Sequence, residues 1–266
     1  MATATLPVGR EIAEAKQKAI EVARRHAYTR PQNKALTIEE AKACSDLAYK
    51  GKVDEPTSDR KWCITRDGVF DTWITGFRAV LLKAASAQDR RMILAFAGTD
   101  SSFESIRSTL DVLLDAGTDI YQALNFNPLA IPDQYNQAAT LAEKIQRTYG
   151  DQLRVTGHSL GGGLASFVSL KFDIPGAGIN AAPLGVGTLL HLLMFGKRKP
   201  SRFTHYDNNG EIVSSYAPGV QVGEVCQVQT NAGAIDAHLL ENVNTNAPMF
   251  CYDRFTAAGT GATGSW

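Results

Sequence analysis

Several features typical of other protein classes are missing from this 266-residue sequence. Lys plus Arg and Asp plus Glu both number 27, so the sequence lacks the basic excess that nucleic-acid binding requires. No apolar run approaches the roughly 18 residues of a membrane span, and the first residues contain no apolar signal-peptide core. We therefore expect a soluble protein that binds no nucleic acid. It would be cytoplasmic, or exported by a route that needs no classical signal peptide.

Cysteine is also scarce. The four cysteines, Cys44, Cys63, Cys226 and Cys251, form no C-x-x-C pair and no closely spaced set. This spacing argues against a zinc site and against a dense disulfide framework. It predicts four free thiols, most of them buried, and no bound metal.

The composition is that of a globular protein, with 44% hydrophobic and 20% charged residues. We expect a single α/β domain over residues 1–256 that includes N-terminal helices, followed by a loose Gly- and Thr-rich tail over 257–266. Residues 9–26 have a narrow, alanine-rich apolar stripe typical of a surface helix. Thr37 and Glu40 form a capping box that begins a second helix, which ends near Tyr49.

Apolar segments with strand-like patterns follow. Residues 61–65, 73–77 and 77–83 predict early strands, with a hairpin turn at Arg66–Gly68. Met92–Ala97 is a continuous apolar run, as expected of a central strand that is buried on both faces.

Three later segments also carry predictions. Residues 133–149 have the apolar spacing of a helix that packs on the sheet. The apolar segment 188–195 precedes three cations and has two interpretations, a core helix or a contact with an anionic membrane; we favour the core helix. Valines recur over 220–228 and suggest a peripheral hairpin.

The most informative motif is G-x-S-x-G at Gly157–Gly161. A short strand over 152–156 leads into it, and Leu160–Lys171 has helical apolar spacing. In such a turn the two glycines remove Cβ atoms that would collide, so the hydroxyl of Ser159 stands exposed at the end of a sheet. This context predicts a nucleophilic serine.

A serine hydroxyl needs a base, because it is a weak nucleophile at its ordinary pKa. His158 adjoins the nucleophile and its side chain points away, His26 precedes the strands, and His191 lies in the apolar segment. In α/β-hydrolases the order along the chain is serine, acid, histidine. His238, the last histidine, is therefore the predicted base.

Two carboxylates compete for the role of the acid. Asp207 stands at the end of a predicted strand, and Glu211 follows an Asn-Asn-Gly turn four residues later. Asp236 is too close in sequence to His238 to reach its Nδ1. The local sequence leaves Asp207 and Glu211 nearly equal.

An oxyanion hole completes the expected site. The backbone N–H of Leu160, directly after the serine and at a helix start, provides one donor. Thr99, in the Gly98 turn at the end of the apolar strand, is the second candidate. Because nucleophile, base and oxyanion turn are all present, an enzyme is favoured over a non-catalytic binding module with a hydrolase fold.

These motifs resemble the class 3 (fungal-type) lipase family of α/β-hydrolases. Residues 155–165 are similar to the family's nucleophile block, and Phe96–Asp100 resembles its oxyanion turn. The resemblance implies an α/β-hydrolase fold with a mostly parallel central sheet flanked by helices, and a lid over residues 101–115. Residues 209–214 look like the segment that carries the family's acid. This likeness places Glu211, rather than Asp207, at the acid position, although the family has aspartate there.

A narrower likeness is to bacterial lipase effectors delivered by type VI secretion, which implies a phospholipid target. Together the residues and the resemblance predict a serine carboxylic-ester hydrolase of lipid esters that forms an acyl-enzyme and needs no cofactor. Triacylglycerol lipase, phospholipase and short-chain carboxylesterase remain alternatives. Its expected partners are the lipid or ester substrate and, transiently, a membrane or lipid interface. The sequence makes no prediction of oligomeric state.

Overall fold

A single mixed sheet forms the centre of the molecule. The computed structural model describes residues 35–72, 74–98, 132–195, 201–217 and 219–254. Its eight strands lie side by side in chain order. They are β1 (Trp62–Thr72), β2 (Phe77–Ala84), β3 (Met92–Phe96), β4 (Leu153–His158), β5 (Gly176–Ile179), β6 (Phe203–Asn208), β7 (Gly223–Val228) and β8 (Met249–Arg254).

The strands from β3 to β7 pair in parallel, and antiparallel pairs extend the sheet at both edges. This arrangement confirms the predicted α/β fold with a mostly parallel centre. Parallel strands end at the same edge of a sheet, so the loops after β4 and β6 are brought together there. These loops carry the candidate nucleophile and acid.

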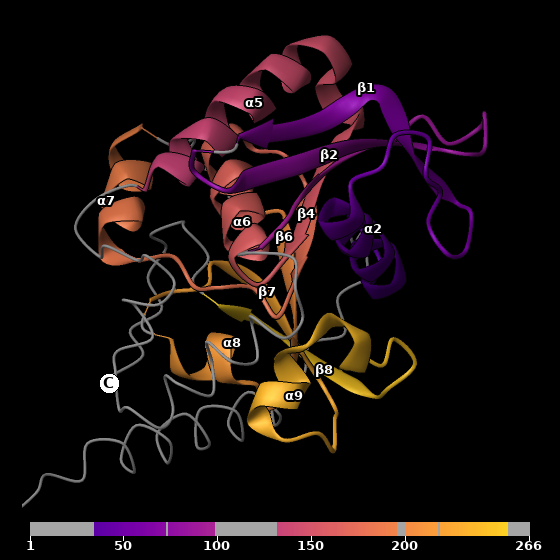
Figure 1. Ribbon diagram of the computed structural model, residues 1–266. Helices are drawn as coiled ribbons and strands as arrows, with labels where there is room; N and C mark the ends of the chain where they lie inside the picture. The colour runs from indigo at the N-terminus through magenta and orange to yellow at the C-terminus, as the bar shows by residue number, and fades with distance from the viewer. Residues whose placement is uncertain (1–34, 73, 99–131, 196–200, 218, 255–266) are drawn as a thin grey trace, which may run out of the picture.

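Helices cover both faces of the sheet (Figure 1). The helical segments are α2 (Ile38–Lys50), α5 (Asp133–Tyr149), α6 (Leu160–Phe172), α7 (Val186–Phe195), α8 (Ile212–Tyr216) and α9 (Ala234–His238), with short 3₁₀ turns at Gly150–Gln152 and Leu240–Asn242. Helix α2 packs on one face, and α5 and α6 pack on the other. Among the described residues, no helix combines the length and the apolarity needed to cross a bilayer.

Helix α2 confirms the predicted capping box. The Glu40 N–H donates to Thr37 Oγ1 at 3.2 Å, and the Thr37 N–H donates to Glu40 Oε2 at 3.0 Å. The helix ends at Gly51, whose left-handed backbone (φ 57°) suits glycine. Helix α5 has the bounds that its apolar spacing predicted.

The burial of β3 on both faces explains why apolar and polar residues do not alternate in its sequence. Leu94 and Phe96 face α5 and α6, whereas Ile93 and Ala95 face α2, and all four are fully buried. Each large side chain buried in this way contributes about 1.5–3 kcal/mol through the hydrophobic effect. Both faces of the strand must therefore be apolar, as predicted.

The prediction of a hairpin turn at Arg66–Gly68 is wrong. Strand β1 continues through these residues to Thr72, with a shift of register between Ile64 and Val69, and the chain turns at residues 74–76. A Cβ on Gly68 would lie 2.6 Å from the carbonyl oxygen of Leu81, so this glycine serves close approach of the two strands. Gly76 (φ 64°) supplies the left-handed backbone at the turn.

The prediction of a peripheral hairpin over residues 220–228 is also wrong. Strand β7 pairs in parallel with β6, and its antiparallel partner is β8, which the sequence did not predict. The segment between β7 and β8 contains α9 and His238. A partner so distant along the chain lies beyond the reach of local pattern.

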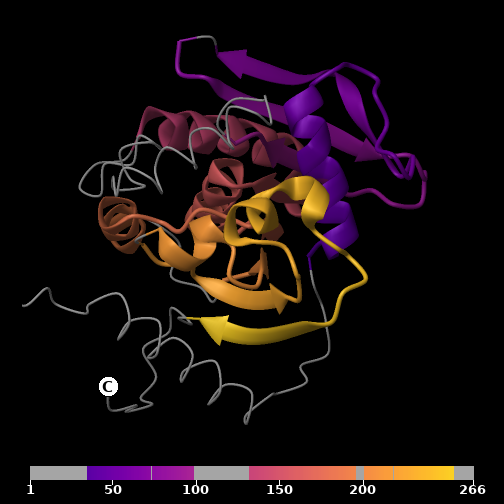
Figure 2. The ribbon, with the colours of Figure 1, turned by 60° about the horizontal axis from the view of Figure 1, so that its bottom comes forward.

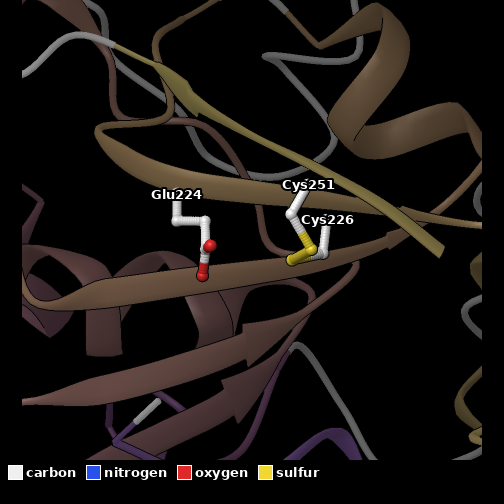
Figure 3. A group of neighbouring side chains, drawn as sticks. All are labelled: Glu224, Cys226 and Cys251. Carbon is white, nitrogen blue, oxygen red and sulfur yellow. A yellow bond between two sulfur atoms is a disulfide. The ribbon is translucent and has the colours of Figure 1, made fainter. Parts of the chain in front are cut away.

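The cysteines correct another prediction. Cys226 and Cys251 form a disulfide, and only Cys44 and Cys63 are free (Figure 3). The two bonded cysteines are direct partners in the β7–β8 register, which the sequence spacing did not reveal. Glu224 lies beside them on β7, but the disulfide uses both sulfurs, so the three side chains form no metal site in this state.

Three other expectations fall outside the described residues. They are the N-terminal helix at 9–26, the lid at 101–115 and the tail at 257–266. These remain predictions.

Candidate active site

Ser159 lies on a sharp turn between β4 and α6. Its backbone has φ 57° and ψ −126°, an unusual conformation for a residue with a side chain. Strand β4 ends at His158 and α6 begins at Leu160, so no loop separates the two elements. The strand–turn–helix context predicted around Ser159 is therefore present.

The two glycines of the motif allow this turn to pack. A Cβ on Gly157 would lie 2.3 Å from the carbonyl carbon of Gly161. A Cβ on Gly161 would lie 2.2 Å from the carbonyl oxygen of Phe96 at the end of β3. Both distances are far below contact, so any side chain at either position would force backbone apart.

Ser159, His238 and Glu211 form one hydrogen-bonded chain. Ser159 Oγ lies 2.9 Å from His238 Nε2, and His238 Nδ1 lies 2.6 Å from Glu211 Oε2. All three residues are buried. The Glu211 carboxylate can only accept this hydrogen bond, so Nδ1 of His238 carries the proton. The other ring nitrogen, Nε2, is then unprotonated and can accept the proton of the serine hydroxyl. This tautomer is the one that a general base requires.

The start of α8 fixes the carboxylate of Glu211. As the N-cap residue, Glu211 accepts the Val213 N–H at 2.8 Å through Oε2 and the Ser214 N–H through Oε1. Gly210 (φ 78°) forms the turn that leads to it. Two backbone donors and the imidazole therefore orient both carboxylate oxygens.

Asp207 has a different contact. It lies fully buried on β6, where its Oδ2 accepts from Gln221 Nε2 at 2.9 Å. Side chains alternate between the two faces of a strand, and only Glu211, beyond the strand end, reaches His238. Of the two carboxylates left open by the local sequence, the structure thus joins Glu211 to the histidine.

Three side chains to which the sequence analysis gave no role hold the backbone at Ala237 and His238. The carbonyl oxygen of His238 accepts from His158 Nε2 at 2.8 Å and from Asn180 Nδ2 at 2.9 Å. The preceding carbonyl, of Ala237, accepts from Asn180 Nδ2 at 2.9 Å and from Asn208 Nδ2 at 2.7 Å. The base is thereby tied to the ends of β4, β5 and β6.

The proton positions on His158 follow from its partners. A carbonyl only accepts, so Nε2 must carry a proton, and Nδ1 then accepts from the Tyr49 hydroxyl at 2.8 Å. Burial, and secondarily the nearby His238, lowers the pKa of His158 to about 3, so its ring is neutral at physiological pH. Burial raises the pKa of Tyr49, which keeps that hydroxyl a donor.

One side of the expected oxyanion hole lies within the described residues. The Leu160 N–H stands at the first position of α6, where helix geometry provides no intrahelical acceptor. Gly98 approaches the nucleophile, because a Cβ there would lie 3.4 Å from Ser159 Cβ. Thr99 itself lies outside the described residues, so its role as second donor stays a prediction.

A cavity of about 630 Å³ lies between α2 and residues 239–245. Tyr49 and His158 line it, together with charged side chains of α2. Ser159 is not among the described residues that line this cavity. The cavity thus borders His158 but, among the described residues, not the nucleophile, and we assign it no role in binding the acyl chain.

A family model places this site among known proteins. The model described as a Tle-like phospholipase domain matches residues 41–256, which include the elbow, the acid and the base. The chain belongs to this phospholipase-like family. Membership confirms the predicted kinship with lipases and phospholipases, whereas the narrower likeness to secreted effectors stays a prediction.

A relative of this phospholipase-like chain is the extracellular phospholipase A1 of Serratia liquefaciens, which is 31% identical over 118 residues. That match covers 44% of the chain but only 31% of the relative. Among solved structures, a Rhizomucor miehei lipase–propeptide complex is similar with a TM-score of 0.49 at 16% identity, over 72% of the chain and 67% of that structure. A triacylglycerol lipase from Penicillium expansum is similar with a TM-score of 0.46 at 15% identity, over 72% and 78%.

Proposed function

We propose that this protein is a serine hydrolase that cleaves carboxylic esters of phospholipids. The observation that carries the proposal is the continuous hydrogen-bonded chain Ser159–His238–Glu211 at the strand-to-helix turn. Membership in the phospholipase-like family supports phospholipid as the substrate.

The geometry supports a two-step acyl transfer. Ser159 Oγ attacks the ester carbonyl carbon while His238 Nε2 takes its proton, and Glu211 stabilises the imidazolium that forms. The Leu160 N–H donates to the developing oxyanion. Collapse of the tetrahedral intermediate transfers the proton from His238 to the leaving alcohol and leaves an acyl-Ser159 ester. Water, deprotonated by the same histidine, then releases the fatty acid and restores the serine.

The first test is Ser159→Ala. We expect the variant to lose at least about 10³-fold in kcat on a p-nitrophenyl ester, because the nucleophile is gone. A fluorophosphonate probe should label the wild type at Ser159 and leave the variant unlabelled. Hydrolysis by Ser159→Ala at the wild-type rate would exclude the assignment, and a folded wild type that resists the probe would indicate a non-catalytic binding module.

The substrate class needs a separate test. The test measures kcat/KM on three substrates: a phospholipid, a triacylglycerol and a short-chain soluble ester. The phospholipid and the triacylglycerol carry the same acyl chains. We expect the phospholipid to be preferred. Preference for the short-chain ester would assign a carboxylesterase, and preference for the triacylglycerol would assign a lipase.

We also propose where the enzyme acts. A phospholipid substrate implies transient contact with a membrane or lipid interface. The Cys226–Cys251 disulfide supports action in an oxidising compartment rather than in the reducing cytosol. Thiol-trapping mass spectrometry on protein isolated from its native compartment tests this, because two blocked thiols and one disulfide are expected.

A further inference from the structure

We propose that the outward face of α7, formed by Leu190, Leu193 and Met194, docks on an anionic phospholipid bilayer. This inference rests on the proposed function, because it names the surface through which that enzyme meets its substrate. The sequence of this segment allows either a core helix or a contact with an anionic membrane, and favours the core helix.

Helix α7 has two unlike faces. Leu189 and Leu192 pack against the main core. Leu190, Leu193 and Met194 stand at i, i+3 and i+4, so they share the opposite face, and they are 52%, 65% and 69% exposed. The expectation of a core helix thus holds for one face of α7 only.

The exposed face is a cluster rather than scattered residues. Within the described parts of the chain, five large hydrophobic side chains are exposed, and three of them belong to this one helical face. The other two, Val53 and Ile74, are in separate loops. Single exposed apolar residues are ordinary, whereas a contiguous apolar group marks an interaction surface.

Charge complementarity selects the partner. The sequence after α7 continues Gly196-Lys197-Arg198-Lys199, three consecutive cations. Lys171 of α6 lies beside the helix, with its Nζ 2.6 Å from His191 Nε2. An apolar helical face accompanied by cations fits a bilayer surface rich in anionic headgroups, where each cation adds about 1 kcal/mol of attraction.

The outward face of α7 belongs to a helix that is connected to the active site. Residues 180–185 join β5 to α7, and within them the Ala182 N–H donates to the carbonyl oxygen of Ser159 at 2.9 Å. Helix α7 therefore begins four residues after a direct contact with the backbone of the nucleophile. It lies at the periphery of the molecule on the side of α8, which begins after Glu211 (Figure 2). Docking through α7 would hold the active site near the lipid headgroups.

Vesicle binding by catalytically inactive protein tests the proposal. In the Ser159→Ala background, co-sedimentation compares vesicles of phosphatidylcholine alone with vesicles that also contain phosphatidylglycerol. We expect binding to the anionic vesicles, weakened by salt. The double substitution Leu193→Gln/Met194→Gln keeps good helix formers at exposed positions and should weaken this binding at least about tenfold.

A matched control is Val53→Gln, an apolar-to-polar change at an exposed residue in the loop after α2, which should leave binding unchanged. Two results would overturn the proposal: equal binding to neutral and anionic vesicles, or equal vesicle binding by the double variant and its parent. If the double variant binds vesicles equally but changes its oligomeric state, a second copy of the chain covers this face.

A soluble ester separates this proposal from the proposed function. When it is made in protein that retains Ser159, the Leu193→Gln/Met194→Gln variant should hydrolyse a soluble p-nitrophenyl ester at the wild-type rate and lose activity only on vesicles. If the wild type cleaves no ester at all, the proposed function fails, and the sedimentation result still decides the docking surface.

Discussion

His158 Nε2 donates a hydrogen bond to the carbonyl oxygen of His238, over 2.8 Å. The residue that precedes the nucleophile in sequence thus holds the backbone of the base, although 80 residues separate the two histidines. Tyr49 on α2 completes this link through its hydrogen bond to His158 Nδ1. The position of the base relative to the nucleophile is therefore fixed by this backbone contact of His238 as well as by the hydrogen bonds of the triad.

The two candidate acids should respond differently to neutralisation. Glu211→Gln keeps the shape of the side chain but removes the charge that stabilises the imidazolium and selects its tautomer, so kcat should fall by roughly 10³–10⁴-fold. Asp207→Asn should stay within a few-fold of the wild type, because its contact is to Gln221. Steady-state kinetics on a soluble ester measure both. Greater loss in Asp207→Asn than in Glu211→Gln would reverse the assignment.

The low pKa of His158 predicts a pH dependence of stability. With a folded pKa of about 3 and an ordinary value near 6.5, the unfolded chain binds a proton in this window that the folded chain does not. The free energy of unfolding should therefore fall as pH drops below about 6.5, by up to about 1.4 kcal/mol per pH unit. Above that pH the contribution of His158 is constant.

Urea unfolding of wild type and His158→Gln at neutral and mildly acidic pH measures this effect. The glutamine amide can still donate to the His238 carbonyl but does not titrate, so the variant should be less sensitive to acid. Other titrating groups are common to both proteins and cancel in the comparison. Equal slopes would mean that His158 is not buried in its neutral form.

Reduction of the disulfide should destabilise the region that carries the base. Cys226 and Cys251, 25 residues apart in sequence, close a loop that contains His238. In the chain-entropy model, losing a cross-link that closes a loop of this length lowers the free energy of unfolding by about 3.5 kcal/mol. Thermal unfolding and ester hydrolysis, each with and without dithiothreitol, should show a lower Tm and earlier loss of activity in the reduced enzyme.

Two serine variants separate this effect from other thiol chemistry. Cys226→Ser/Cys251→Ser should unfold at the lower temperature without reductant and show no further change when it is added. Cys63→Ser retains the disulfide and should respond to reductant as the wild type does. A double variant as stable as the wild type would contradict a stabilising role for the disulfide.

The glycines of the elbow should not tolerate a side chain. Gly161→Ala would place Cβ 2.2 Å from the Phe96 carbonyl oxygen, so the backbone of β3 and α6 must separate. We expect more than about 3 kcal/mol of destabilisation, or insoluble protein, because overpacked backbone cannot relax as a side chain can. Gly233→Ala is the matched control, since a Cβ there meets nothing within 4 Å, and it should change stability by less than about 1 kcal/mol. Equal stability of the two variants, measured by urea unfolding, would show that the elbow is looser than its geometry indicates.

The sequence alone determined the parts of the molecule that depend on local pattern. The Thr37–Glu40 capping box, the run of β3 and the strand–turn–helix around Ser159 each act over a few residues, so their structure could be predicted from neighbours in the chain. Chain order then selected His238 among five histidines. The prediction of a hairpin turn at Arg66–Gly68 was wrong because it also relied on local pattern. The role of Gly68 depends instead on Leu81 in the next strand.

Only the tertiary structure decided what depends on residues distant along the chain. Asp207 and Glu211 are four residues apart, and only the end of β6 and the start of α8 determine which carboxylate faces His238. The Cys226–Cys251 disulfide required the β7–β8 register, and the network of His158, Asn180 and Asn208 required the ends of three parallel strands to meet. These contacts join segments that sequence separation keeps apart, so their partners are set by packing and register rather than by local propensity.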